Sequence, residues 1–179
     1  MAWTTEMQSA TPSVVDLAQV KPPRGLGDFK VHFAMTPTEP DGAEFVAFEL
    51  SCPTCLGDAF HLLELSASLG PAGIRARCAA CDHEGQVFDA TTDGYDGVYG
   101  HLDFLKTAQT AKPLEGKSDV LLGAVQVRAG FSYSIPMSEL MEHAEEARVE
   151  PQDLFDWFYI LTKTADVEAW EWTWDFECA

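Results

Sequence analysis

Two short cysteine motifs, Cys52-Pro53-Thr54-Cys55 and Cys78-Ala79-Ala80-Cys81, decide how the first half of this chain folds. Each C-x-x-C turn presents two sulfur atoms from one tight loop. The 22 residues between the motifs are long enough for a β-hairpin that returns the second turn to the first. Strand-like residues lead into each turn. We therefore expect the four sulfur atoms to meet.

Four thiolates at the corners of a tetrahedron form a ligand set that suits structural zinc. The pattern C-x2-C-x22-C-x2-C predicts one structural Zn2+ held by Cys52, Cys55, Cys78 and Cys81. Gly57 and Gly85 lie just beyond the pairs, where the backbone has to turn and offer N–H groups to sulfur. Residues 44–89 resemble the zinc-ribbon class, a module common in transcription, translation and adaptor proteins. The resemblance implies a fold and a metal but no activity, because ribbons share a structure more than a function.

The same cysteines argue against a catalytic zinc. A catalytic site keeps one coordination position open for water, whereas four cysteines close the shell. His61 and His83 lie near the motifs, but four thiols make them unnecessary as ligands. The H-x-E signature of zinc deaminases is missing upstream of Cys52, and two pairs at ribbon spacing do not suit a redox C-x-x-C. Nucleophile motifs, phosphate loops and Rossmann glycines are also missing, so we predict a protein that is not an enzyme.

Period-two alternation dominates the rest of the chain. It predicts strands at residues 29–35, 44–51, 60–66, 74–77, 86–88, 124–135 and 167–177. Helical spacing predicts one helix from Pro136 to Ala147 and a second that opens near Pro151 and runs through Leu161. A short helix is expected at residues 101–107, within an acidic loop. The fold class is therefore α+β, mainly antiparallel β-sheet with an inserted zinc-ribbon module at residues 44–89 and a late helical pair.

Domain organisation follows from composition. Residues 1–27 contain scattered prolines and glycines and predict a loosely ordered N-terminal arm. Residues 28–179 are then a single α+β domain. The first residues lack a basic and apolar leader, and no apolar run is long enough to span a membrane. Together with paired cysteines, which suit a reducing compartment, these features predict a soluble cytoplasmic protein.

The charge balance favours basic partners. The chain has 29 Asp and Glu against 11 Lys and Arg, a formal net charge of -18. A field of this sign repels nucleic acid and anionic membranes and attracts basic proteins, although acidity can also serve solubility alone. Arg75 and Arg77 are the only basic pair in the ribbon-like segment, and we expect them to pair with Glu49 or Glu64. Nucleic-acid binding is therefore disfavoured.

The last 44 residues combine acids with aromatic side chains. They hold twelve acids against Arg148 and Lys163, a net charge of -10. Their aromatic residues suit either the core of a sheet or the anchors of an interface ringed by acids. The candidate partner-binding residues are Glu168, Trp170, Glu171, Trp172 and Asp175.

These observations lead to three hypotheses for function. The first is a non-enzymatic acidic zinc-containing protein that binds a basic protein partner, such as an immunity-type inhibitor of a secreted nuclease toxin, by analogy of size, acidity and missing catalytic motifs. The second is a zinc-ribbon regulatory adaptor of the transcription or translation machinery. The third is a nucleic-acid-acting enzyme with a structural zinc.

Overall fold

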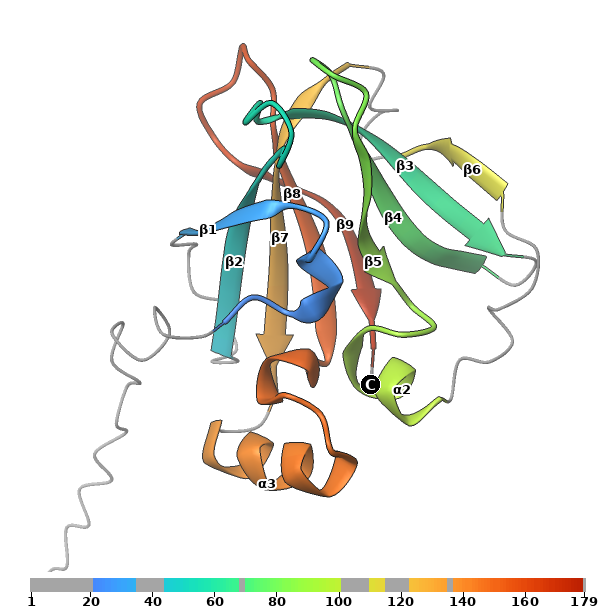
Figure 1. The fold of residues 1–179 in the computed structure, drawn as a ribbon, viewed down its shortest axis with the longest axis vertical. Coiled ribbons are helices and arrows are strands. Elements are labelled where there is room, and N and C mark those ends of the chain that lie inside the picture. The colour runs from blue at the N-terminus through green and yellow to red at the C-terminus, as the bar shows by residue number, and fades with distance from the viewer. Residues whose placement is uncertain are drawn as a thin grey trace, which may run out of the picture.

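The computed structural model describes residues 21–34, 44–67, 70–100, 110–114, 123–134 and 137–178. Its strands are β1 (Lys30–Ala34), β2 (Glu44–Ser51), β3 (Ala59–Ala67), β4 (Gly70–Cys78), β5 (Glu84–Asp89), β6 (Thr110–Pro113), β7 (Val125–Tyr133), β8 (Trp157–Lys163) and β9 (Glu171–Glu177) (Figure 1). Its α-helices are α2 (Gly94–Tyr99) and α3 (Met137–Ala147), and its short 3-10 helices are η1 (Arg24–Leu26) and η3 (Pro151–Asp153). The prediction of a mainly antiparallel β-sheet is confirmed.

Strand β7 holds the sheet together. Along one edge it pairs with β8, and along the other it pairs with β2 and, at its start, with β3. This produces one layer in the order β1-β2-β7-β8-β9, to which β6-β3-β4-β5 is joined through the start of β3. All of these pairs are antiparallel. The sheet curls into a half-barrel (Figure 1).

The main core fills the concave side of this half-barrel. Phe88 of β5 stacks on Phe158 of β8 with ring centroids 4.4 Å apart, and Phe131 of β7 meets Phe155 edge-on at 4.7 Å. Period-two alternation in β2 and β7 sends every second apolar side chain to this side. Burial of each of these aromatic side chains stabilises the fold by about 1.5–3 kcal/mol.

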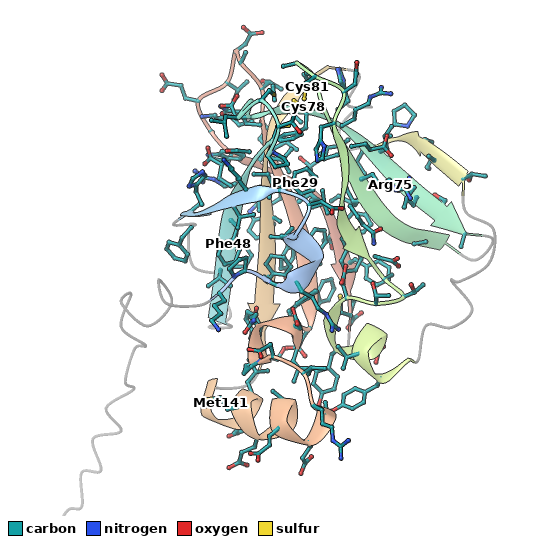
Figure 2. All side chains as sticks on the ribbon, in the orientation of Figure 1. Phe29, Phe48, Arg75, Cys78, Cys81 and Met141 are labelled. Carbon is teal, nitrogen blue, oxygen red and sulfur yellow. The ribbon has the colours of Figure 1, made fainter. Side chains whose placement is uncertain are left out.

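The α-helices α2 and α3 lie at one end of the β structure (Figure 1). In α3, which carries Met141 (Figure 2), Leu140 and Ala144 are buried, while Met141 is 60% exposed. The predicted first late helix is therefore confirmed, and Leu140 and Ala144 form the part of its apolar stripe that faces the core. None of the helices in the described parts of the chain is long and apolar enough to cross a membrane.

The second late helix was predicted wrongly. Residues 151–153 form only a 3-10 turn, and Trp157–Lys163 is strand β8, which lies between β7 and β9 in the five-stranded layer. Phe155, Phe158 and Leu161 have helical spacing, but β8 is apolar on both faces, which hides its period of two. Aromatic and β-branched residues favour a strand in such a run, and pairing with β7 and β9 decides the outcome.

Two other expectations fall partly outside the described residues. The helix expected at residues 101–107 lies there, and the structure places α2 just before it, at Gly94–Tyr99. Residues 1–20 of the predicted N-terminal arm also lie outside the description. The last part of that arm forms η1, which buries Leu26 in the main core. The Arg24 backbone N–H donates to buried Asp153 at 2.9 Å and fixes η1 to η3.

Candidate metal centre

The two cysteine turns are structural repeats of each other. In the first, the Leu56 N–H donates to the Cys52 carbonyl (2.9 Å) and the Cys52 N–H donates to the Gly57 carbonyl (2.8 Å). In the second, the Asp82 N–H donates to the Cys78 carbonyl (3.0 Å) and the Cys78 N–H donates to the His83 carbonyl (2.8 Å). The same bonds at the same offsets mean that both motifs form the same knuckle.

Each knuckle places the residue after its second cysteine in the left-handed region. Leu56 has φ 64° and Asp82 has φ 58°. Aspartate tolerates this conformation, whereas for leucine it costs on the order of 1–2 kcal/mol. The side chain of Leu56 is 62% exposed, so burial does not offset this cost.

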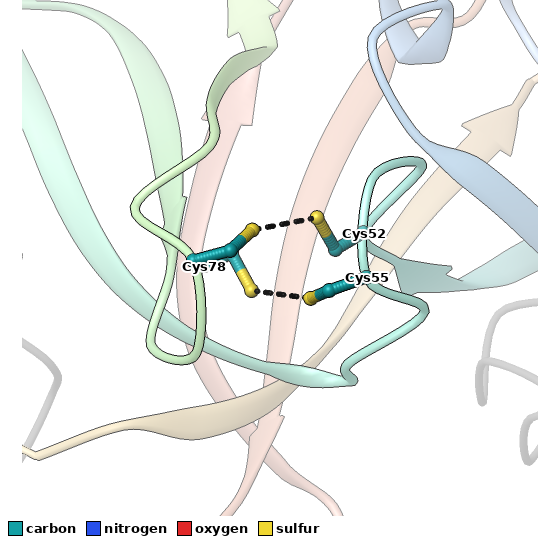
Figure 3. Close-up of side chains that lie close together, drawn as sticks. Cys52, Cys55 and Cys78 are labelled. Atoms are coloured by element: carbon teal, nitrogen blue, oxygen red, sulfur yellow. Dashed lines mark hydrogen bonds between the residues drawn. The ribbon is translucent and has the colours of Figure 1, made fainter.

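The four sulfur atoms converge between the knuckles. The Sγ atoms of Cys52 and Cys81 lie 3.5 Å apart, as do those of Cys55 and Cys78, and all four lie within 4.8 Å of one another (Figure 3). These distances are too long for disulfides, and all four cysteines are free. A tetrahedron with Zn–S bonds of about 2.3 Å has sulfur atoms about 3.8 Å apart. The cluster therefore fits one tetrahedral metal ion.

Burial divides each cysteine pair in the same way. Cys52 and Cys78, which begin the knuckles, are buried in the main hydrophobic core, whereas Cys55 and Cys81 are exposed. The knuckles follow β2 and β4, which belong to the same curled sheet. A metal ion here would therefore join the ends of two strands and connect the core to the surface.

Backbone N–H groups act on the thiols. Burial by itself would raise the pKa of Cys52, but the N–H groups of Cys55 and Thr54 and the neighbouring thiols lower that pKa to about 6. The Gly57 N–H acts to lower the pKa of Cys55, as predicted for this glycine, although the adjacent thiol of Cys78 leaves the pKa raised.

In the second knuckle, His83 rather than Gly85 supplies the N–H group. It acts to lower the pKa of Cys81, but burial and the other three thiols raise this pKa to about 12. A thiolate therefore forms readily at Cys52, whereas a nearby cation would favour ionisation of Cys55 and Cys81 by offsetting the repulsion between thiolates. An all-thiolate set suits zinc and other thiophilic metals.

The two nearby histidines point elsewhere. The His83 Nε2 lies 3.3 Å from the Asp28 carbonyl oxygen, and its ring meets Phe29 edge-on at 6.5 Å. His61 lies in β3, opposite Arg77 of β4. Neither belongs to the cluster of possible ligands in the described part of the chain, which consists of the four cysteines.

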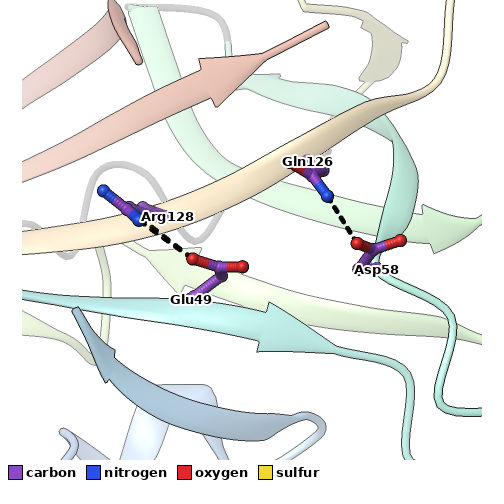
Figure 4. Close-up of polar contacts among 4 residues, drawn as sticks. All are labelled: Glu49, Asp58, Gln126 and Arg128. Carbon is purple, nitrogen blue, oxygen red and sulfur yellow. Dashed lines mark hydrogen bonds and ion pairs between the residues drawn. The ribbon is translucent and has the colours of Figure 1, made fainter. Parts of the chain in front are cut away.

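The expected salt bridges of the ribbon-like segment were predicted wrongly. Arg75 pairs with Glu84 at 3.2 Å, while Glu64 pairs with Lys112 at 3.4 Å. Glu49 pairs with Arg128 of β7 at 3.1 Å, and Gln126 on the same strand donates to Asp58 (Figure 4). The partners of Glu49, Asp58 and Glu64 come from strands far away in the sequence, so a local argument does not find them, whereas Arg75 pairs with Glu84 on the neighbouring strand β5.

The five candidate partner-binding residues lie on β9 and on the loop that precedes it. Glu168, Glu171 and Asp175 are exposed, and Trp172 is 38% exposed. Trp170 is half-buried, with the guanidinium carbon of Arg128 3.9 Å from its ring centroid.

A β-bulge separates the C-terminal tryptophans. Ile160 pairs with Trp174, but the next residue, Leu161, pairs with Trp172, which leaves Thr173 as the extra residue. Trp174 therefore faces the main core and is 8% exposed, while Trp172 lies on the opposite face of the sheet, against Phe45 and Tyr159. Trp174 is therefore part of the core, whereas Trp172 is part of the surface.

Comparison of the chain with protein-family models, curated proteins and solved structures found no match. The knuckle geometry and the sulfur cluster define a chain with a four-cysteine cluster that could hold a metal ion, set in a curled antiparallel sheet.

Proposed function

We propose that this is a non-enzymatic, zinc-containing protein that binds a basic protein partner through β9 and the loop before it. The observation that carries the proposal is Trp172, a large aromatic side chain that is 38% exposed on a strand at the edge of the sheet. Exposed acids share this strand and loop: Glu168, Glu171, Asp175 and Glu177.

An aromatic anchor with an acidic rim suits a basic protein surface. Aromatic residues contribute most of the binding energy of many interfaces, and surrounding charges steer the partner and set the association rate. The net charge of -18 extends this attraction over the whole molecule.

In this proposal the metal has a structural role. A zinc-ribbon-like pair of knuckles with four thiolates leaves no position for water, and it joins the strand ends that follow β2 and β4. Free cysteines of this kind suit the reducing cytoplasm. Size and acidity favour an immunity-type inhibitor of a secreted nuclease toxin as the particular function.

One observation favours the alternative of a regulatory adaptor. Leu56 is 62% exposed at the tip of the first knuckle, in a backbone conformation that is unfavourable for leucine. An adaptor of the transcription or translation machinery would use such an apolar tip as a contact.

The test uses two triple variants with the same change in charge. Glu168, Glu171 and Asp175 are replaced by lysine in one, and exposed Glu139, Glu142 and Glu145 of α3 in the other. Partners are captured from a lysate with the wild-type protein, identified by mass spectrometry and purified, and association rates are then measured at several salt concentrations.

We expect one small basic protein, whose association rate falls by about tenfold or more with the β9 variant and much less with the α3 variant. Equal losses would mean that only total charge matters. Capture of ribosomal or polymerase subunits through Leu56 would support the adaptor instead.

A further inference from the structure

The five-stranded layer has a second, outward apolar cluster on the face opposite the main core. Phe45, Ala47 and Leu161 are buried there, with Tyr159 and Trp170 packed against them. Gly130 of β7 creates the room for this cluster, because a Cβ atom at this position would lie 2.6 Å from the Phe45 ring. Both α-helices lie at the end of the β structure rather than over this face (Figure 1).

Aromatic rings form the exposed part of this face. Trp172 lies with its ring centroid 5.3 Å from Phe45 and 4.8 Å from Tyr159, to which it is nearly perpendicular. Tyr159 in turn stacks parallel to Trp157 at 6.1 Å. We call Phe45, Trp157, Tyr159 and Trp172 the outer aromatic cluster. Its rings hold one another in place, so a ligand would meet a surface that is already ordered.

The protein already binds one of its own arginines on this face. The Arg128 guanidinium lies over the Trp170 ring at 3.9 Å and is held by the Glu49 carboxylate through two N–H groups, at 3.1 and 3.2 Å (Figure 4). A ring below a guanidinium and a carboxylate beside it are the two groups that a bound arginine requires.

A second ring and carboxylate of the same kind lie nearby. Asp175 is the cross-strand neighbour of Tyr159, so it lies on the outer face beside the aromatic cluster. Asp175 is exposed, and Trp172 keeps 38% of its surface accessible. Asp175 and Trp172 therefore offer the same two groups as Glu49 and Trp170, a carboxylate and an aromatic ring.

The charge of the surroundings decides the class of ligand. Exposed Glu171, Asp175 and Glu177 repel phosphates and a second copy of this chain, which would bring another charge of -18 to the same place. A planar guanidinium stacks on a ring and binds a carboxylate through two N–H groups, whereas an ammonium is more strongly hydrated and does neither as well.

We propose that the outer aromatic cluster and Asp175 form a recognition site for an arginine side chain of a basic protein partner. This rests on the proposed function and deepens it, because it names the residue type that the partner inserts. A site of this kind should bind arginine more tightly than lysine. Simple attraction between opposite charges would not distinguish the two residues.

The test is a titration of the full-length, zinc-loaded protein with basic peptides, in which NMR signals of the tryptophan indole N–H groups report binding. The probes are two peptides in which glycine alternates with a basic residue. One peptide carries three arginines and the other carries three lysines. Variants Trp172→Leu and Asp175→Asn are compared with Glu142→Gln, which removes one exposed charge on α3.

We expect the Trp172 signal to shift and the arginine peptide to bind about threefold or more tightly than the lysine peptide. Trp172→Leu and Asp175→Asn should each weaken the arginine peptide by a similar factor, while Glu142→Gln should have little effect. The unchanged indole signal of buried Trp174 checks that the variants fold.

Equal affinity for both peptides would overturn the arginine site but leave the proposed function standing, since diffuse attraction still brings a basic protein to β9. A Trp172 indole signal that does not move when the arginine peptide binds, or no binding of either peptide, would also overturn it. The proposed function is tested separately, by the replacement of Glu168, Glu171 and Asp175 with lysine.

Discussion

Asp93 is a carboxylate in an unfavourable environment. Burial raises its pKa from 3.8 to about 6, with a smaller contribution from Asp89, although the Asp89 N–H donates to it at 2.8 Å and Arg24 lies nearby. Because the pKa is higher in the folded than in the unfolded state, ionisation of Asp93 costs stability as the pH rises from about 4 to above 6.

Replacement of Asp93 by asparagine should therefore stabilise the protein at neutral pH, because the amide oxygen can still accept the Asp89 N–H. We expect the free energy of unfolding to increase by about 1–3 kcal/mol at pH 8 and by less at pH 5. Urea unfolding of both proteins at the two pH values measures this difference. A gain that is constant with pH would show that the carboxylate is not the cause.

Replacement of Cys81 by serine should remove the metal. Structural zinc contributes an apparent binding free energy of about 10–16 kcal/mol in small modules, which is comparable with the stability of a whole domain. We expect zinc per chain to fall from one to near zero and β2–β5 to lose protection in hydrogen exchange. Cys178→Ser, at a buried cysteine outside the cluster, should keep one zinc per chain. A Cys81→Ser protein that stays folded without metal would contradict the structural role.

At the scale of single elements, the contact between Arg128 and Trp170 connects β7 to the loop before β9. The same arginine is ion-paired with Glu49 of β2, and its side chain is only 18% exposed. This one side chain therefore links three parts of the outer face.

A double-mutant cycle with Arg128→Ala and Trp170→Leu should give a coupling of about 0.5–1 kcal/mol. Chemical unfolding of the wild type, both single variants and the double variant supplies the four free energies. Arg75→Ala, which breaks the more exposed pair with Glu84, should cost less than about 1 kcal/mol. Additive effects of Arg128→Ala and Trp170→Leu would mean that the ring and the guanidinium do not interact.

The strands that sequence alone predicted show a period of two in their apolar residues. In β2, Val46, Phe48 and Leu50 point to the core, and the period of two is readable. In β8 both faces are apolar, which hides the strand. The strand at β9 was predicted, but its bulge at Thr173 interrupts the alternation, so Trp172 and Trp174 face opposite ways. No local pattern encodes either feature, because both depend on the neighbouring strands.

The cysteine cluster was predictable because its four members lie in two short motifs of the sequence. Two C-x-x-C pairs need only a β-hairpin between them to meet, and β3 and β4 form that hairpin. The outer aromatic cluster was not predictable, because Phe45 and Tyr159 belong to strands that become neighbours only across Gly130.

For the molecule as a whole, the net charge of -18 should make stability depend on salt. Repulsion between like charges destabilises the compact state, and added salt screens it as the Debye length falls from about 30 Å at 0.01 M to 8 Å at 0.15 M.

Raising NaCl from about 10 to 150 mM should therefore increase the free energy of unfolding by about 1 kcal/mol. Thermal unfolding of the zinc-loaded protein measures this effect. The increase should be smaller in the α3 variant, in which Glu139, Glu142 and Glu145 are replaced by lysine, because the net charge of this variant is lower in magnitude. An equal effect in both proteins would point to weak ion binding rather than screening.

The position of the knuckles also has a consequence for the order of events in time. Cys52 and Cys81 are 29 residues apart, whereas Glu49 and Arg128, which join β2 to β7, are 79 apart. At a synthesis rate of about 5–20 residues per second, Cys81, the last of the four clustered cysteines, leaves the ribosome about 2–9 s before β7 does. A zinc ion bound in that interval would hold β2 against the hairpin of β3 and β4 while their common neighbour is still being made.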